Sequence, residues 1–104
     1  MAGSKRGRKR RRNKNHGLLV ALRHPVRRKI LRRMSDERKA SPSELSKAID
    51  QPLSSVAYHV RVLVTCGALK PVSERELKGS TQHFYRWSVT AEWVRPLLEE
   101  DDDE

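Results

Sequence analysis

Residues 52–69, PLSSVAYHVRVLVTCGAL, constrain the fold most, because they have the period of a helix and a boundary signal at each end. Apolar residues recur there at intervals of three and four, which places them on one helical face. They are Leu53, Val56, Ala57, Val60, Leu63 and Val64. Pro52 suits the first helical position, and Gly67 suits the left-handed residue just past the last turn. The sequence therefore predicts an amphipathic helix with a buried apolar face.

The other side of this predicted helix is polar and carries little charge. It presents Ser54, Ser55, Tyr58, Val62 and Thr65, with His59 and Arg61 on its flanks. Hydroxyls, a phenol and a guanidinium are groups that contact base edges and phosphates in a DNA groove. A polar side that merely faces water is the alternative interpretation, and the neighbouring segments help to decide between the two.

A shorter helix is predicted immediately before this one. Ser41, Pro42 and Glu44 combine an N-cap serine, a proline at the first helical position and a glutamate at the third, which is a capping box. The apolar residues that follow are expected to face inward; they are Leu45, Ala48 and Ile49. Only Asp50 and Gln51 connect the two helices, so the corner is sharp. This arrangement is typical of a helix-turn-helix.

Two more helices are predicted upstream. Leu18, Leu19 and Leu22 can pack on one side of a short first helix, which is expected to end at His24 because Pro25 disfavours helical geometry there. The helix that begins at Pro25 has an apolar side and a basic side. Val26, Ile30, Leu31 and Met34 are expected inward, and Arg27, Arg28, Arg32 and Arg33 outward.

The chain downstream of Leu69 predicts a β-hairpin and a last helix. Residues 70–73 and 83–89 are expected to be strands around a polar loop that contains Gly79 and Ser80. Arg75 and Lys78 lie near the loop tip, where they are well placed for phosphates or a minor groove. The aromatic residues of the second strand are expected in the core; they are Phe84, Tyr85 and Trp87. Thr90 can cap a last helix that carries Trp93, Leu97 and Leu98, with Pro96 limiting its regularity.

Three segments together resemble the winged-helix domain of the ArsR-type bacterial and archaeal transcriptional regulators. They are LRHPVRRKILRRM, SSVAYHVRVLVTCGAL and KPVSERELKGSTQHFYRWS, and the resemblance covers residues 18–88. Ala57 stands where the family usually has serine, and Val60 where it usually has leucine. The resemblance implies a mainly α fold with a small β-hairpin wing, a winged helix-turn-helix. It also implies that the first and last helices form a dimer interface.

Charge is distributed unevenly along the 104 residues, which have a formal net charge of +10. Residues 1–16 hold eight Lys or Arg and no acid, residues 17–98 hold 15 basic and 7 acidic residues, and residues 99–104 are all acidic. We expect a disordered basic arm at 1–16, the winged helix-turn-helix domain at 17–98 and an acidic tail at 99–104. A basic arm on a basic domain indicates a polyanionic partner.

The function predicted is that of a transcriptional regulator that binds specific double-stranded DNA sequences. The recognition helix, about 53–66, is expected in the major groove, with the wing, about 70–88, and the arm on the backbone. The predicted DNA-binding residues are Ser54, Ser55, Tyr58, His59 and Arg61 in the helix, Arg75 and Lys78 in the wing, and Arg8, Arg10, Arg11 and Arg12 in the arm. An RNA-binding or ribosome-associated basic protein is the open alternative, and a winged helix that binds another protein is a third.

A homodimer is expected, because the first and last helices offer more apolar surface than so small a fold covers. The residues concerned are Leu18, Leu19, Leu22, Trp93, Leu97 and Leu98.

Other classes of function find little support in the sequence. No paired carboxylates, nucleophile motif or glycine-rich phosphate loop indicates an enzyme, and no cofactor is expected. Cys66 is the single cysteine, and the histidines show no close ligand spacing, so we expect no metal site. The histidines are His16, His24, His59 and His83. With no long apolar run and no disulfide, the protein is expected in the cytoplasm, associated with the nucleoid.

Overall fold

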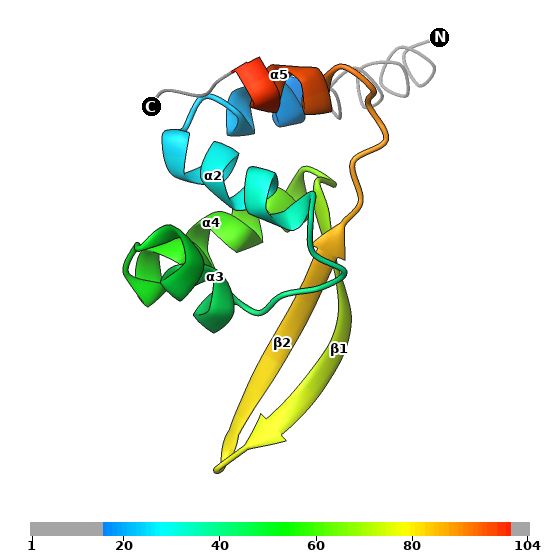
Figure 1. The fold of residues 1–104 in the computed structure, drawn as a ribbon. Coiled ribbons are helices and arrows are strands. Elements are labelled where there is room, and N and C mark those ends of the chain that lie inside the picture. The colour runs from blue at the N-terminus through cyan, green and yellow to red at the C-terminus, as the bar shows by residue number, and fades with distance from the viewer. Residues whose placement is uncertain (1–15, 101–104) are drawn as a thin grey trace, which may run out of the picture.

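In the computed structural model of the protein, residues 16–100 are described. A short helix at 16–21 precedes α2 (Pro25–Met34), α3 (Pro42–Ile49), α4 (Leu53–Thr65), β1 (Leu69–Leu77), β2 (Ser80–Trp87) and α5 (Val94–Glu100). The helices gather at one end of the molecule, and the β1–β2 hairpin extends away from them (Figure 1). This is the mainly α fold with a hairpin wing that the sequence predicts.

The break between the first two helices lies at His24, as expected. His24 is the N-cap of α2, with its Nδ1 accepting a hydrogen bond from the Val26 backbone N–H at 3.2 Å, and Pro25 begins the helix. The inner face of α2 forms the centre of the core, because Ile30, Leu31 and Met34 are completely buried.

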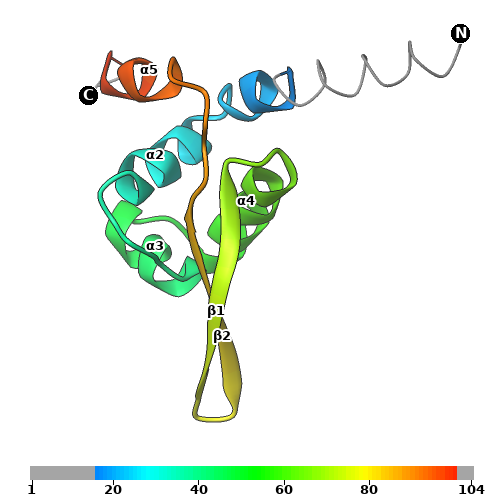
Figure 2. The same ribbon diagram turned by 90° about the vertical axis from the view of Figure 1, so that its right-hand side faces the viewer.

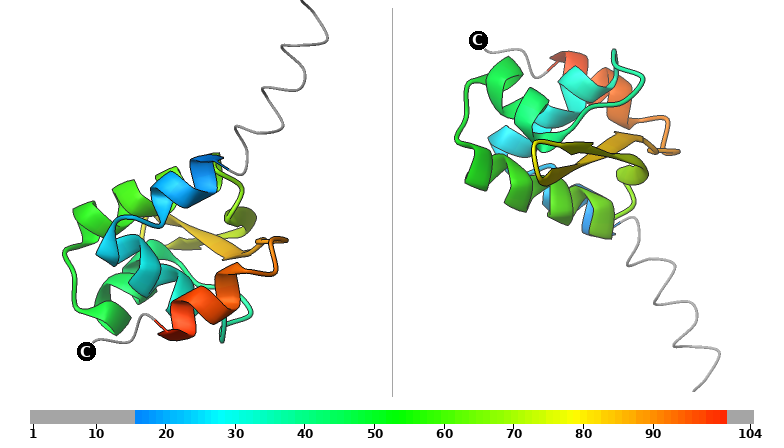
Figure 3. Two further views of the ribbon diagram at one scale, coloured as in Figure 1. Left: turned by 90° about the horizontal axis from the view of Figure 1, so that it is seen from above. Right: turned by 90° about the horizontal axis from the view of Figure 1, so that it is seen from below.

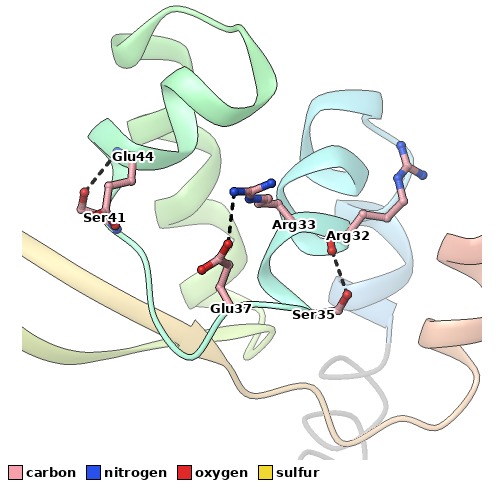
Figure 4. A network of polar contacts seen from close by, with 6 residues as sticks. All are labelled: Arg32, Arg33, Ser35, Glu37, Ser41 and Glu44. Carbon is pink, nitrogen blue, oxygen red and sulfur yellow. Dashed lines mark hydrogen bonds and ion pairs between the residues drawn. The ribbon is translucent and has the colours of Figure 1, made fainter.

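The basic side of α2 is not simply a solvated face. Arg28 Nη1 donates to the Leu22 carbonyl at 2.8 Å, and Arg32 Nη1 donates to the Leu98 carbonyl at 3.3 Å. Arg33 pairs with Glu37 at 3.2 Å, as Figure 4 shows. These contacts tie α2 to helix 16–21, to α5 and to the loop that follows α2. The expectation of four outward arginines missed this structural role.

The capping box of α3 is confirmed. Ser41 Oγ accepts from the Glu44 backbone N–H at 3.2 Å, while Glu44 Oε1 accepts from the Ser41 N–H at 3.1 Å (Figure 4). Such reciprocal bonds satisfy two donors that the first helical turn leaves without partners. Leu45 is buried, but Ala48 is exposed, so its predicted inward position is wrong.

The turn between α3 and α4 is as tight as expected. Asp50 adopts a left-handed conformation with φ of 57°, and its N–H bonds to the Ser46 carbonyl. The Gln51 N–H bonds to the same carbonyl at 3.1 Å, and Ser46 Oγ donates to the Gln51 carbonyl at 2.5 Å. Pro52 is the N-cap of α4 rather than its first helical residue, so the helix begins one residue later than Pro52 suggested. The helix-turn-helix is thereby closed by local hydrogen bonds.

Helix α4 buries a narrower face than its sequence suggests. Val56, Val60 and Leu63 are at most 1% exposed and pack on the core, whereas Leu53, predicted to be inward, is 51% exposed. Leu53 is the first residue of α4, one turn before the buried residues of the helix begin. The helix ends as predicted, with Gly67 at a φ of 85°.

The hairpin is longer than predicted. β1 and β2 pair antiparallel from Leu69↔Trp87 to Leu77↔Ser80, so the loop expected between the strands shrinks to Lys78 and Gly79. Both residues have positive φ, of 51° and 82°, which is the pattern of a type I′ turn. Such a turn matches the twist of paired strands, so pairing continues to the tip. Polar residues expected in a loop therefore lie in strands.

The base of the hairpin is fixed to the helices by its aromatic residues and by a short bridge. Phe84 is buried, and Tyr85 and Trp87 pack against the core, which confirms their predicted structural role. Ala40, in the loop before α3, exchanges two backbone hydrogen bonds with Tyr85, at 3.0 and 2.9 Å.

The last helix begins later than predicted. α5 starts at Val94, so Thr90 does not cap it, and Pro96 lies in its first turn, where a missing N–H leaves no bond unmade. Val94 and Leu98 are buried. Glu99 and Glu100, assigned to the acidic tail, are helical, while residues 1–15 and 101–104 lie outside the described residues. The arm residues Arg8, Arg10, Arg11 and Arg12 are among these.

Candidate nucleic-acid interface

A polar stripe runs along the outer side of α4. Ser54, Tyr58, Arg61 and Thr65 follow one another at intervals of four, three and four, and all four side chains are exposed. The stripe lies opposite the buried residues of the same helix, so it is the surface that α4 offers to a partner. Three of the predicted DNA-binding residues, Ser54, Tyr58 and Arg61, are brought together here.

Two other predicted residues of α4 lie off this stripe. Ser55 is half-buried. His59 is only 6% exposed, and its Nδ1 accepts a hydrogen bond from Arg27 Nε at 3.1 Å. The expectation that His59 presents its side chain at the DNA-facing surface is therefore wrong. The sequence predicts His59 on a flank of α4, and in the structure α2 packs against that flank.

His59 instead joins α4 to the start of α2. The rings of His24 and His59 lie 4.2 Å apart, centroid to centroid, and the Tyr58 ring stands edge-on to His59 at 5.1 Å. Burial lowers the pKa of His59 below its ordinary value of 6.5, and the nearby His24 and Arg27 lower it further. Neutral imidazole is also the form that can accept the Arg27 bond. Neutral His59 therefore packs against the Tyr58 ring and helps to hold Tyr58 on the stripe.

Acidification is expected to destabilise the fold through His59. Because its native pKa is lowered, the unfolded chain binds a proton more readily than the native chain does. The stability contributed by neutral His59 is complete above pH 6.5 and is lost as the pH falls through the lowered native pKa. Urea denaturation between about pH 8 and pH 5 should show a falling free energy of unfolding, and His59→Gln should flatten this dependence.

His83 provides the matched control for this prediction, because its side chain is 53% exposed on the hairpin. His83→Gln tests whether removing an exposed imidazole from the hairpin flattens the pH dependence as His59→Gln does. If the free energy of unfolding falls as steeply with decreasing pH in His59→Gln as in the wild type, groups other than His59 cause the pH dependence.

The hairpin carries the two predicted wing residues near its free end. Arg75 is exposed on β1, and Lys78 is the first residue of the turn. Glu74 lies close by and pairs with His83 at 3.6 Å, so the charge of the hairpin is mixed. Figure 2 shows the hairpin tip projecting well beyond the helices, and the right-hand view of Figure 3 looks along the hairpin from its tip toward the helices. Arg75 and Lys78 thus reach a region that α4 does not reach.

Sequence reasoning missed a group of cations at the hairpin base. Arg38, Lys39 and Arg86 line, together with Val72, a cleft of about 410 Å³. Lys39 Nζ lies 3.4 Å from Ser73 Oγ and 5.0 Å from the centre of the Phe84 ring. The bridge between Ala40 and β2 brings these cations together. No pattern near Lys39 in the sequence signals that long-range contact.

Cys66 lies where α4 meets helix 16–21. A Cβ placed on Gly17 would be 3.7 Å from the Cys66 Cβ, so the two elements pack closely. Burial raises the pKa of the Cys66 thiol, which disfavours the thiolate that binds metals. Within residues 16–100, no three His, Cys, Asp or Glu side chains are grouped so as to hold a metal ion. The absence of a metal site stays a prediction.

The end of the molecule opposite the hairpin tip exposes several large apolar side chains. Leu18, Leu22 and Leu98, which were predicted to form a dimer interface, are buried in the core of the chain itself. Four other residues of helix 16–21 and the α5 region remain 37 to 51% exposed: Leu19, Val20, Trp93 and Leu97. Both segments lie at this end in Figures 1 and 2. We call these four residues the apolar patch.

None of the helices at 16–100 combines the length and apolar character that a membrane crossing requires.

Comparison with known proteins reveals relatives of this fold. The family model of a helix-turn-helix domain matches residues 22–72. The transcriptional repressor BigR from Xylella fastidiosa is similar in structure, with a TM-score of 0.68, 24% sequence identity, and 96% of this chain and 98% of that chain covered. HlyU from Vibrio cholerae has a TM-score of 0.62 and 26% identity, with 86% and 89% covered.

A third solved structure is a homodimeric winged helix-turn-helix DNA-binding domain from Mycobacterium bovis, a possible ArsR-family transcriptional regulator. It has a TM-score of 0.62 and 18% identity, with 85% of this chain and 74% of that chain covered. None of the curated proteins matches the chain. The likenesses establish a winged helix-turn-helix fold.

Proposed function

We propose that this chain, whose residues 22–72 belong to a helix-turn-helix domain family and whose fold is the winged form of ArsR-type regulators, is a transcriptional regulator that binds specific sequences in double-stranded DNA. The polar stripe of α4 would enter the major groove, and the hairpin would contact the neighbouring backbone or minor groove. The family and fold are those of regulators, so the chain is not an enzyme.

The exposed stripe of α4 carries this proposal. Ser54, Tyr58 and Arg61 stand on a helix held rigidly by a short turn and by a buried opposite face. Hydroxyls and a guanidinium on a rigid helix can make directed hydrogen bonds to base edges and phosphates. The aromatic side chains of the hairpin are used in packing, which leaves few exposed platforms for stacking single-stranded bases. The arrangement favours duplex DNA over RNA.

The active form in this proposal is a homodimer joined through the apolar patch. Four large apolar side chains exposed at one end of so small a protein are well suited to a two-fold contact. The Mycobacterium bovis domain with the same fold is homodimeric. A two-fold protein would recognise a palindromic DNA site, with one α4 in each half.

The proposal also assigns roles to the chain ends and a location. The basic residues of 1–16 would bind phosphates without reading bases, because the attraction between cations and phosphates does not depend on the base sequence. The domain would span 17–98, and the acidic tail 99–104 would stay free of DNA because phosphates repel it. We place the protein in the cytoplasm, on the nucleoid.

Substitutions on α4 and on the hairpin should affect binding in different ways. Tyr58→Ala is expected to reduce binding to a selected DNA site about 10-fold or more while changing binding to random duplex little, because a base contact worth about 1–3 kcal/mol is lost. Lys78→Ala should weaken binding to both duplexes alike and lower the logarithmic salt slope by ~0.9, since one phosphate contact is lost. Fluorescence anisotropy at several salt concentrations measures both effects.

Tyr58→Phe serves as a control, because it keeps the ring and removes only the hydroxyl that could bond to a base. The function proposed is wrong if no duplex sequence is bound more tightly than random DNA, or if structured RNA displaces every duplex tested.

A further inference from the structure

Leu53 is a large apolar side chain on α4 that the core does not bury. It is 51% exposed at the first position of the helix, whereas the core residues of α4 begin at Val56. Ser54 follows it in the chain and is exposed, and Ala57, one turn later on the same side, is only half-buried. Leu53 and Ala57 thus form an apolar edge along the N-terminal part of the polar stripe.

The proposed dimer contact does not account for this exposure. α4 meets helix 16–21 at its other end, through Cys66, and a helix advances about 1.5 Å per residue. Leu53 therefore lies roughly 18 Å along the axis from the last residue of α4, away from the segment that bears part of the apolar patch. A partner that covers the patch would leave Leu53 in water.

The chemistry of the major groove offers a matching partner. Thymine presents a C5 methyl group there, next to the hydrogen-bonding edge of the base pair, and aliphatic side chains contact that methyl. The N-terminal residues of a recognition helix are the ones that approach base edges. An apolar edge next to the hydroxyls of Ser54 and Tyr58 therefore fits a base pair that has a methyl beside its polar groups.

We propose that Leu53, backed by Ala57, reads a thymine methyl in each half of the DNA site. This inference rests on the proposed function, because it requires α4 to lie in the major groove. It deepens that function by naming a feature of the preferred sequence: at least one thymine in each half-site, selected by an apolar contact rather than by a hydrogen bond.

Replacement of thymine by uracil tests the contact directly, since uracil lacks only the methyl group. A binding site is first selected from random duplex DNA, and each thymine in one half-site is then replaced in turn. Wild-type affinity is expected to fall about fourfold at one position, as the loss of one buried methyl group predicts. Leu53→Ala should bind the thymine duplex more weakly and should show no difference between thymine and uracil at that position.

Val72→Ala is the matched control, because Val72 is also an exposed apolar residue, on the hairpin. This variant should keep the full sensitivity to uracil. Thermal unfolding of Leu53→Ala should match the wild type, since the side chain lies outside the core. The inference is overturned, with the proposed function intact, if a site is selected but uracil changes affinity at no position, or changes it equally in Leu53→Ala. Failure to select any site removes the proposed function and this inference with it.

Discussion

Deletion of residues 2–14 is expected to produce a large, sequence-independent loss of DNA affinity. The deletion removes eight of the 23 Lys and Arg residues and ends before the described domain begins at His16. If all eight neutralise phosphates, the slope of log K against log salt should flatten by ~7. The ratio of the full-length affinity to the truncated affinity should then be about 10⁴-fold smaller at 200 mM salt than at 50 mM salt. Anisotropy titrations on the selected site and on random duplex would measure this effect.

A charge-preserving control separates phosphate binding from any role of particular arginines. Replacing every arginine of the arm by lysine should keep the slope, because the counterions released depend on charge. A loss of affinity restricted to the selected site would mean that the arm reads bases, and an unchanged slope would mean that it does not engage DNA.

A charge placed in the apolar patch should convert the proposed dimer to a monomer. Leu97→Glu introduces a carboxylate that dimerisation would have to desolvate, and it removes a leucine from both copies. The loss of two buried leucines alone, at about 1.5 kcal/mol each or more, raises the dimer dissociation constant at least about a hundredfold. Sedimentation equilibrium should then show a monomer at concentrations where the wild type is a dimer.

Leu77→Glu is the control for this experiment, because Leu77 is exposed to a similar degree on the hairpin, far from the patch. It should leave the dimer intact. The monomeric Leu97→Glu variant should keep its fold and lose most of its affinity for a palindromic site, because only one α4 is held on the DNA. A wild-type protein that sediments as a monomer at micromolar concentration, with or without DNA, would contradict the dimer.

The features predicted correctly from the sequence are those fixed by residues close together in the chain. Ser41 and Glu44 form their capping box within a single turn, and Gly67 ends α4 because few other residues adopt its conformation easily. His24 marks a helix break because Pro25 follows it. Periodicity also placed the innermost residues of α2 correctly, since its apolar stripe is flanked by charge on both sides.

The features predicted wrongly depend on contacts between distant segments. His59 is buried where α2 packs on α4, and Arg27, 32 residues earlier, bonds to it there; the sequence around His59 contains no sign of this contact. Leu53 has the correct helical phase for burial, yet within residues 16–100 no element covers it and its side chain is 51% exposed. The length of the hairpin depends on a turn in which Lys78 adopts a positive φ, an unusual conformation for lysine.

The close packing of Gly17 against Cys66 has a consequence for the DNA sites of the proposed dimer. Helix 16–21 contacts the end of α4 and also carries Leu19 and Val20 of the apolar patch. The relative orientation of the two recognition helices would therefore depend on one short helix in each subunit. Each added base pair turns one half-site relative to the other by about 34°. If this contact holds the orientation fixed, the proposed dimer would accept a single spacer length, and its operators would be defined by spacing as well as by bases.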